Sequence, residues 1–280
     1  MYDYYCAVRQ SSRVGGELDS AGDSISAPAA LSARYAVLSL GRQRYSPMLV
    51  AICKGQDASI SSQIATKMAV QGIQEEAFSC YEQTPAASLA VAEHAGDEKL
   101  CIEIIRASFK RANQQVHDYS QRMLSSRAVC CHGTMAVLIG RHISVGRVGQ
   151  YESFLWRAGQ IHRFFQPEPS REAISLALSC SIGKDKRVWV ELASTELEKS
   201  DVVIITTQLF SEKLISRIKM VVQSLGSLDE GCCDLAEFGV EQHWQSREGS
   251  LAGLAGGDSV VFMLRAESPV IDLKDVILEE

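Results

Sequence analysis

The sequence lacks most features of membrane-spanning, secreted or nucleic-acid-binding chains. No apolar run approaches the ~20 residues that a membrane-spanning helix needs. The segment Met1–Arg9 does not place an apolar core after a basic stretch, so we expect no signal peptide. A net charge of −6 leaves no basic footprint, which argues against nucleic acid as a partner. We therefore expect a soluble cytoplasmic protein.

The cysteines also lack the spacing of a metal or redox motif. There are nine of them, and none lies in a C-x-x-C pair. His132 follows the adjacent pair Cys130 and Cys131, but structural zinc uses ligands two to four residues apart in paired knuckles. We expect buried, reduced thiols, because a free cysteine packs as a small hydrophobe in a reducing cytosol.

Size and composition indicate an ordinary globular protein. The chain has 280 residues, of which 46% are hydrophobic and 22% are charged. That length suffices for one large domain or two small ones. We find no internal repeat and no cluster of proline and glycine that would mark a linker. We therefore expect a single domain spanning residues 1–280.

The clearest local pattern is a strand, a short turn and a helix. Leu49–Cys53 is an apolar run typical of a buried strand, and Lys54–Ser59 forms a polar turn. After the turn, apolar residues recur at helical spacing to about Phe78. Such a turn lies at the end of a sheet, where it can face a ligand.

Other segments alternate between strand and helix patterns. A second helix is predicted from about Glu98 to Leu124, with an apolar stripe at Ile105, Phe109, Ala112, Val116, Tyr119 and Met123. Strands are predicted at Tyr4–Arg9, Tyr35–Leu40, Met48–Cys53 and Val202–Ile205, and Gly133–Trp156 reads as a run of hairpins in an antiparallel sheet. A helix lined by Leu214, Ile218, Val221 and Leu225 follows Val202–Ile205.

Five stretches of the chain resemble signature segments of the metal-dependent Ser/Thr protein phosphatases (PPM, type 2C). Gly133–Trp156 is similar to the family's G-T-T-A…V-G-D-S-R and keeps Gly133, Thr134, Ala136, Val148 and Gly149 in register, with Gln150, Tyr151 and Glu152 in place of Asp, Ser and Arg. The other four are Ser12–Ile25, Leu49–Ala69, Asp201–Glu212 and Gly256–Leu264. The resemblance implies the family's α+β fold, a β-sandwich of two antiparallel sheets flanked by helices (αββα).

The resemblance also identifies the positions of a metal site. Four aspartates hold two divalent cations in the family, and their places here are taken by Asp23, Lys54, Gln208 and Gly256. Gly55 is kept and offers a backbone carbonyl. Two divalent cations want several anionic oxygens. We therefore expect vestigial positions with Asp23 the only retained carboxylate, no catalytic residue, and no metal or other cofactor.

Lys54 suggests two interpretations of the vestigial pocket. Its ammonium could replace the cation, lying against Asp23 and the carbonyls around Gly55. It could equally point to solvent. Asp57 and Asp258 lie close in sequence to Lys54 and Gly256, and as displaced ligands they could restore metal binding.

The function we predict is a catalytically inactive pseudophosphatase. It would be a protein-binding or regulatory module in Ser/Thr phosphorylation signalling, with a kinase, a phosphoprotein or a related phosphatase as its partner. The alternative is an active protein phosphatase that hydrolyses phosphoserine and phosphothreonine through displaced ligands and needs Mn²⁺ or Mg²⁺. Fold alone does not decide between them.

Overall fold

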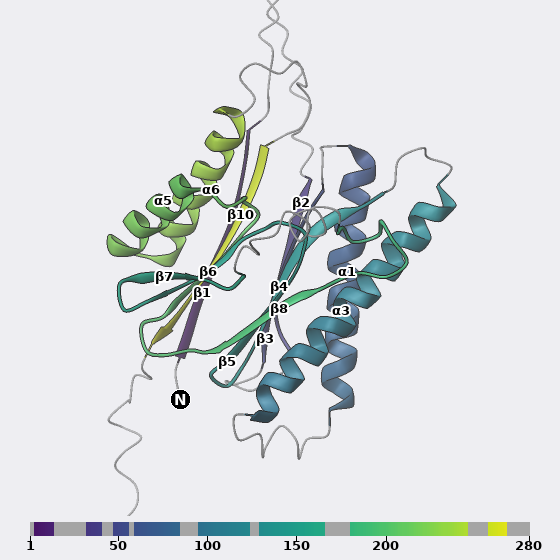
Figure 1. Ribbon diagram of the computed structural model, residues 1–280, viewed down its shortest axis with the longest axis horizontal. Coiled ribbons are helices and arrows are strands. Elements are labelled where there is room, and N and C mark those ends of the chain that lie inside the picture. Colours follow the sequence, from purple (N-terminus) through teal and green to yellow (C-terminus); the bar gives the residue numbers. More distant parts are fainter. Residues whose placement is uncertain are drawn as a thin grey trace, which may run out of the picture.

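Two antiparallel five-stranded sheets pack face to face in the computed structural model (Figure 1). The first sheet has the order β1 (Asp3–Arg13), β10 (Gly257–Glu267), β9 (Val202–Thr206), β6 (Ser153–Arg157) and β7 (Gln160–Arg163). The second has the order β2 (Ala33–Ser39), β3 (Met48–Gly55), β4 (Cys131–Ile139), β5 (His142–Val148) and β8 (Glu191–Glu196). The structure describes residues 3–13, 32–40, 47–55, 59–84, 95–123, 129–165, 180–245 and 257–267.

One pair of helices covers the outer face of each sheet. α1 (Ile60–Gln83) and α3 (Ala95–Arg122) pack on the second sheet, and α5 (Glu212–Gln223) and α6 (Leu228–Gln245) pack on the first (Figure 1). The layers are therefore helix, sheet, sheet, helix, which confirms the predicted αββα sandwich.

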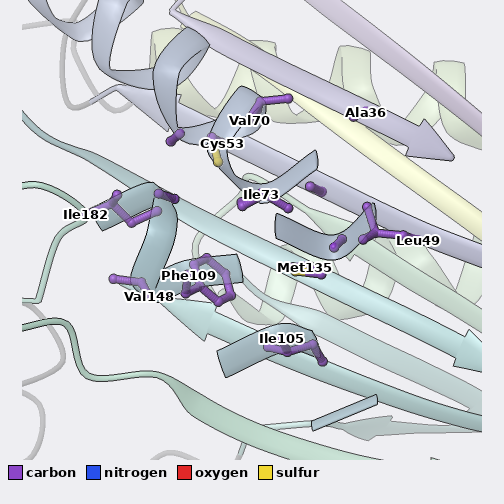
Figure 2. Close-up of a cluster of buried hydrophobic side chains, with 14 of the residues drawn as sticks. Ala36, Leu49, Cys53, Val70, Ile73, Ile105, Phe109, Met135, Val148 and Ile182 are labelled. Atoms are coloured by element: carbon purple, nitrogen blue, oxygen red, sulfur yellow. The ribbon is translucent and has the colours of Figure 1, made fainter. Parts of the chain in front are cut away.

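Strand alternation separates the core into layers. In β3, Val50 and Ile52 face the other sheet, whereas Leu49, Ala51 and Cys53 face α1 and α3. The layer beneath α1 and α3 is shown in Figure 2, where Phe109 and Ile105 of α3 meet Met135 and Val148 of the sheet. Burying each such large side chain contributes about 1.5–3 kcal/mol.

The helices follow the predicted patterns with corrected ends. α1 begins after Ser59, whose hydroxyl accepts a hydrogen bond from the Ser62 amide at 3.2 Å, and it continues five residues beyond the predicted end at Phe78. In α3 the first four residues of the predicted stripe are fully buried, but Met123 lies past the helix end and is exposed. The helix predicted after β9 is α5, with Leu214, Ile218 and Val221 buried.

The hairpin run of residues 133–156 is divided between the two sheets. β4 and β5 pair in the second sheet, and β6 pairs with β7 in the first. Residues 149–152 carry the chain across. Gly149 has φ +101°, and a Cβ there would lie 2.5 Å from the His132 ring, so a glycine is required. Both hairpins and their antiparallel pairing are therefore confirmed, with one hairpin in each sheet.

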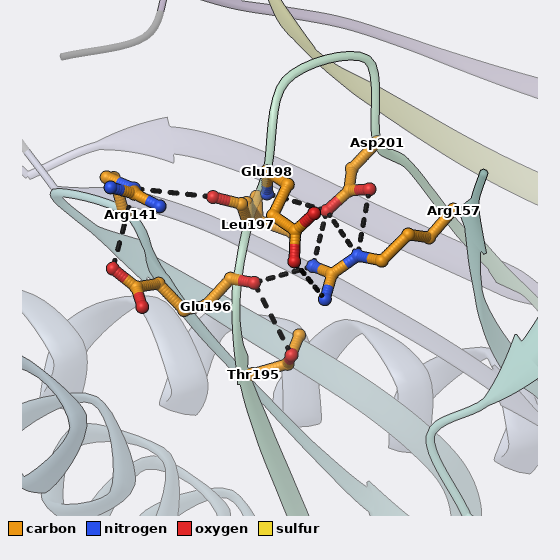
Figure 3. A network of polar contacts seen from close by, with 7 residues as sticks. All are labelled: Arg141, Arg157, Thr195, Glu196, Leu197, Glu198 and Asp201. Carbon is orange, nitrogen blue, oxygen red and sulfur yellow. Dashed lines mark hydrogen bonds and ion pairs between the residues drawn. The ribbon is translucent and has the colours of Figure 1, made fainter.

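An ion pair fastens one end of the sandwich (Figure 3). The Asp201 carboxylate accepts hydrogen bonds from Arg157 Nη2 at 2.6 Å and from the Glu198 amide at 2.7 Å. Arg157 Nη2 also donates to the Glu196 carbonyl at 2.6 Å. Asp201 is buried, and these hydrogen bonds to its carboxylate oxygens offset part of the cost of removing the charge from water. These contacts tie the ends of β6 and β8 to the start of β9.

The nine cysteines are all free thiols, as predicted. Five are buried, whereas Cys6 and Cys233 are exposed, so the expectation of burial holds for only part of the set. None of the helices in the described ranges is both long and apolar enough to cross a membrane.

Candidate vestigial metal site

Three of the positions that the resemblance assigns to the site are described, Lys54, Gly55 and Gln208, and they lie at the other end of the sandwich. β3 and β9 end there, and β2 and β10 begin there. The Asp258 carboxylate accepts hydrogen bonds from the backbone amides of Ser32 and Ala33 and from the Ser32 hydroxyl at 3.1 Å. The start of β2 is thereby joined to the start of β10, across the two sheets.

Lys54 is the penultimate residue of β3. The ladder extends past the predicted strand end, because Lys54 pairs with Ala33 on one side and His132 on the other. Its side chain is half-buried, and Nζ donates a hydrogen bond to the backbone carbonyl of Asp258 in the other sheet. The solvent-facing interpretation of Lys54 is therefore wrong, and the ammonium bridges the sheets.

Gly55 and Tyr151 enclose the backbone of this strand end. The Gly55 amide donates to the Ser32 carbonyl at 2.9 Å, and the Tyr151 hydroxyl donates to the Lys54 carbonyl at 3.5 Å. Burial raises the pKa of the Tyr151 phenol well above its ordinary value, so the hydroxyl stays protonated. The backbone oxygen of Lys54 thus has a donor within the protein.

Gln208 follows β9 but its amide is turned toward α6. Nε2 donates to the Leu235 carbonyl at 2.7 Å and to the Ser259 hydroxyl at 3.2 Å. A Cβ on Gly239 would lie 2.5 Å from Nε2, so the close approach of helix and amide depends on that glycine. The side-chain amide of Gln208 is therefore fixed by hydrogen bonds to α6 and to β10.

His132 lies next to Lys54 on the neighbouring strand, and its role was not predicted. Nε2 is 3.1 Å from the Ser181 hydroxyl, and the ring meets Tyr151 edge-on with centroids 5.6 Å apart. Burial lowers the pKa of His132, so the imidazole is neutral at pH 7. The described residues contain no group of three or more His, Cys, Asp or Glu that could hold a metal. His132, which follows Cys131, therefore belongs to no such group within them.

A buried charge cluster lies where the family's V-G-D-S-R loop ends. Glu152 takes the place of the arginine, and its carboxylate contacts Arg163 at 2.7 Å and Arg147 at 3.4 Å. Arg147 also pairs with Glu191 at 2.9 Å. The Glu152 carbonyl accepts the Thr206 amide at 3.0 Å, which links the cluster to the end of β9. One feature of the sequence pointed to this cluster: Glu152 stands where the family's pattern has an arginine, so the charge at this position is reversed.

The resemblance implies a centre of two divalent metal ions, and the described residues do not fit one. They supply an ammonium at Lys54, an amide at Gln208, and a carboxylate at Asp258 that already accepts three hydrogen bonds. Mg²⁺ and Mn²⁺ need anionic oxygens facing a shared space. Asp23, Asp57 and Gly256 lie outside the described residues.

Comparison with solved structures identifies the fold. The Ser/Thr phosphatase of S. agalactiae superposes with a TM-score of 0.60 at 15% identity, covering 92% of this chain and 99% of that one. Stp1 from Staphylococcus aureus gives 0.61 at 16% identity, with 94% and 95% covered. The catalytic domain of PstP, solved with two manganese ions, gives 0.61 at 11% identity, with 96% and 100% covered.

The chain therefore has the fold of the metal-dependent Ser/Thr protein phosphatases. The family resemblance seen in the sequence is confirmed at the level of the fold. Comparison of the sequence with protein-family models and with curated proteins finds no match.

Proposed function

We propose that the chain is a catalytically inactive, phosphatase-like protein of this fold, a pseudophosphatase. It would bind and regulate a partner in Ser/Thr phosphorylation signalling in the cytoplasm. The observation that carries the proposal is the hydrogen bond from the Lys54 ammonium to the Asp258 carbonyl, together with the sequence resemblance, which aligns Lys54 with the metal-bridging aspartate.

Electrostatics supports the loss of the two-metal centre. A two-metal hydrolase holds its cations about 3.5–4 Å apart, clamping the phosphate and activating a water. A positive charge ~4 Å from a cation repels it by about 4 kcal/mol at an effective dielectric of about 20. Lys54 places such a charge where the bridging carboxylate belongs, and the Gln208 amide adds no negative charge.

The partner we propose is a protein: a kinase, a phosphoprotein or a related phosphatase. The support is the scaffold: the described part of the chain has both sheets and a helix pair on each, while charged residues of the family's signature segments are replaced. The same fold hosts different functions when its site changes.

The competing function is an active phosphatase with displaced ligands, and an activity assay separates the two. Hydrolysis of p-nitrophenyl phosphate and of a phosphothreonine peptide would be followed with Mn²⁺ and with Mg²⁺. We expect rates equal to those of the metal-containing buffer, for the protein as it is and for the Asp23→Ala variant. Metal-dependent turnover that Asp23→Ala abolishes, and that a control variant of the exposed Lys67 retains, would establish the active phosphatase instead.

A further inference from the structure

Trp189 is a large apolar side chain that faces water. It is 72% exposed, whereas Val188 and Val190 on either side of it pack against the core layer beneath α1 and α3. The neighbours therefore anchor the segment, and the tryptophan is held on its outer side. An exposed tryptophan on an anchored segment is typical of a surface that contacts another molecule.

The loop that leads into β8 is fixed by a buried asparagine of α3. Asn113 is 2% exposed, and its Nδ2 donates hydrogen bonds to the backbone carbonyls of Asp185 at 3.0 Å and Lys186 at 3.3 Å. Its Oδ1 accepts a hydrogen bond from the Gly183 amide at 2.7 Å. Gly183 has φ +89°, and a Cβ there would lie 2.2 Å from a side chain of α3. The loop is therefore arranged before any partner binds, which lowers the entropy cost of association.

The same loop carries mostly positive charge. The four consecutive residues Lys184, Asp185, Lys186 and Arg187 are all exposed. Three of them are cationic, in a chain whose net charge is −6. A concentration of positive charge on an acidic protein attracts anionic groups to that place.

α3 adds two further cations beside this loop. Arg106 and Lys110 are exposed, and they share one stripe of the helix with Asn113 because the three recur at intervals of four and three. Since Asn113 contacts the loop, this stripe lies on the side of α3 that faces it. A Cβ on Gly146 would contact both α3 and Val190, at 2.3 Å and 3.3 Å, so α3 stays close to the segment as far as β8 (Figure 1).

Together these side chains form what we call the basic surface: Arg106, Lys110, Lys184, Lys186, Arg187 and Trp189. Within the described part of the chain, neither the two cations of α3 nor the last two cations of the loop form an ion pair. Asp185 offsets one of the five positive charges, and Glu191 at the start of β8 is already paired with Arg147 at 2.9 Å. The surface therefore keeps a net positive charge toward a partner.

The spread of the cations favours a run of carboxylates over a single phosphate group. Recognition of one phosphate needs donors that converge on it. Here Arg106 and Lys110 lie about 6 Å apart along α3, and the loop cations extend the surface further. Alternate side chains of an extended peptide are about 6–7 Å apart, so successive carboxylates of an acidic segment match this spacing.

A membrane or a nucleic acid fits the basic surface less well, because each presents a wide field of negative charge. Charges act over about 8–10 Å at physiological salt, so a wide anionic surface would also meet the acidic remainder of the chain. A short peptide segment meets the basic surface alone, and one apolar residue of it can pack on Trp189.

We propose that the basic surface binds a segment of the protein partner that is rich in aspartate or glutamate. The inference rests on the proposed function in that the partner is a protein, and it adds the chemistry by which that partner is recognised. It uses no residue of the vestigial site. Peptide binding in the absence of metal therefore tests the surface separately from phosphatase activity.

Fluorescence anisotropy tests the surface with a labelled peptide of glutamates around a central leucine. We expect a Kd of about 1–100 μM for the wild type, and at least about tenfold weaker binding at about 0.5 M NaCl. Charge reversal on the loop, Lys186→Glu with Arg187→Glu, should weaken binding at least about tenfold, and so should charge reversal on α3, Arg106→Glu with Lys110→Glu. Trp189→Ser should bind the leucine peptide no better than the wild type binds a peptide with glycine in place of the leucine.

The matched control reverses two exposed lysines on other helices. Lys67→Glu on α1 combined with Lys213→Glu on α5 makes the same change in net charge and should leave the affinity unchanged. Circular dichroism would establish that each variant is folded.

Several results would overturn the proposal. They are a wild type that does not bind the acidic peptide, folded reversed variants that bind it as the wild type does, and equal binding of a peptide with glutamine in place of glutamate. Tighter binding of a phosphothreonine peptide of equal charge, of phosphatidylcholine vesicles with about 30% phosphatidylserine, or of a single-stranded DNA oligonucleotide would each assign the surface to another kind of ligand.

Discussion

The Lys54 ammonium of β3 donates a hydrogen bond to the backbone carbonyl of Asp258 in β10, so a single side chain joins the two sheets at this end of the sandwich. The same residue, Asp258, receives the Ser32 and Ala33 amides on its carboxylate. Three strand ends therefore meet at one aspartate.

Replacing Lys54 should destabilise the protein. Lys54→Ala leaves the Asp258 carbonyl without this donor, and a buried polar group left unsatisfied costs about 1–3 kcal/mol. For a chain of this size that corresponds to a loss of several degrees in Tm. Thermal melts followed by circular dichroism would measure the shift, with Lys67→Ala as the exposed control. An unchanged Tm for Lys54→Ala would refute the structural role of the ammonium.

Replacing Glu152 should have a larger effect on stability. Glu152→Gln removes the carboxylate that Arg147 and Arg163 share, and both arginines are largely buried. Breaking a buried pair by removing one partner typically costs about 3–5 kcal/mol. The measurement is urea unfolding, from which the free energy of unfolding is extrapolated.

A matched control uses a solvent-exposed pair elsewhere in the chain. Glu198→Gln removes a carboxylate that contacts Arg157 at 3.0 Å and is 60% exposed. Exposed pairs contribute about 0–1 kcal/mol. Equal losses for the Glu152 and Glu198 variants would show that burial does not govern the cluster.

His132 should make stability depend on pH below neutrality. Burial lowers its folded pKa, so the unfolded state takes up the proton first as the pH falls. Stability is then lost as the pH decreases below the unfolded value of about 6.5, until the folded pKa is reached. Free energies of unfolding between pH 5 and 8 for the wild type and for His132→Gln would reveal this as a steeper decline in the wild type. Parallel curves would contradict it.

The sequence predicts the scaffold well because apolar periodicity dictates it. Buried strands are predicted from apolar runs, as at Met48–Cys53 and Val202–Ile205. In the same way, the apolar stripe of α3 determines which face of that helix packs on the sheet. α6 and β8 were missed. α6 spreads acidic residues through a segment with two glycines, and β8 is a half-buried edge strand without clear alternation.

The site could be predicted only as a set of positions. The resemblance placed Lys54, Gly55 and Gln208 at one end of the sandwich, and the strand ends do meet there. The partners of these side chains come from residues far away in sequence, such as Asp258 and Leu235, so no local pattern could reveal them. The predicted contact of Lys54 with Asp23 lies outside the described residues.

Titration of Mn²⁺ into the purified protein by isothermal calorimetry tests the central claim most directly, repeated with Asp23→Ala. If the pocket has lost its metal centre, neither protein gives a binding heat at Mn²⁺ concentrations up to about 1 mM. Dedicated carboxylate sites bind divalent metal more tightly than this concentration requires. Binding in the range of about 1–100 μM that disappears with Asp23→Ala would contradict the account and restore the active phosphatase.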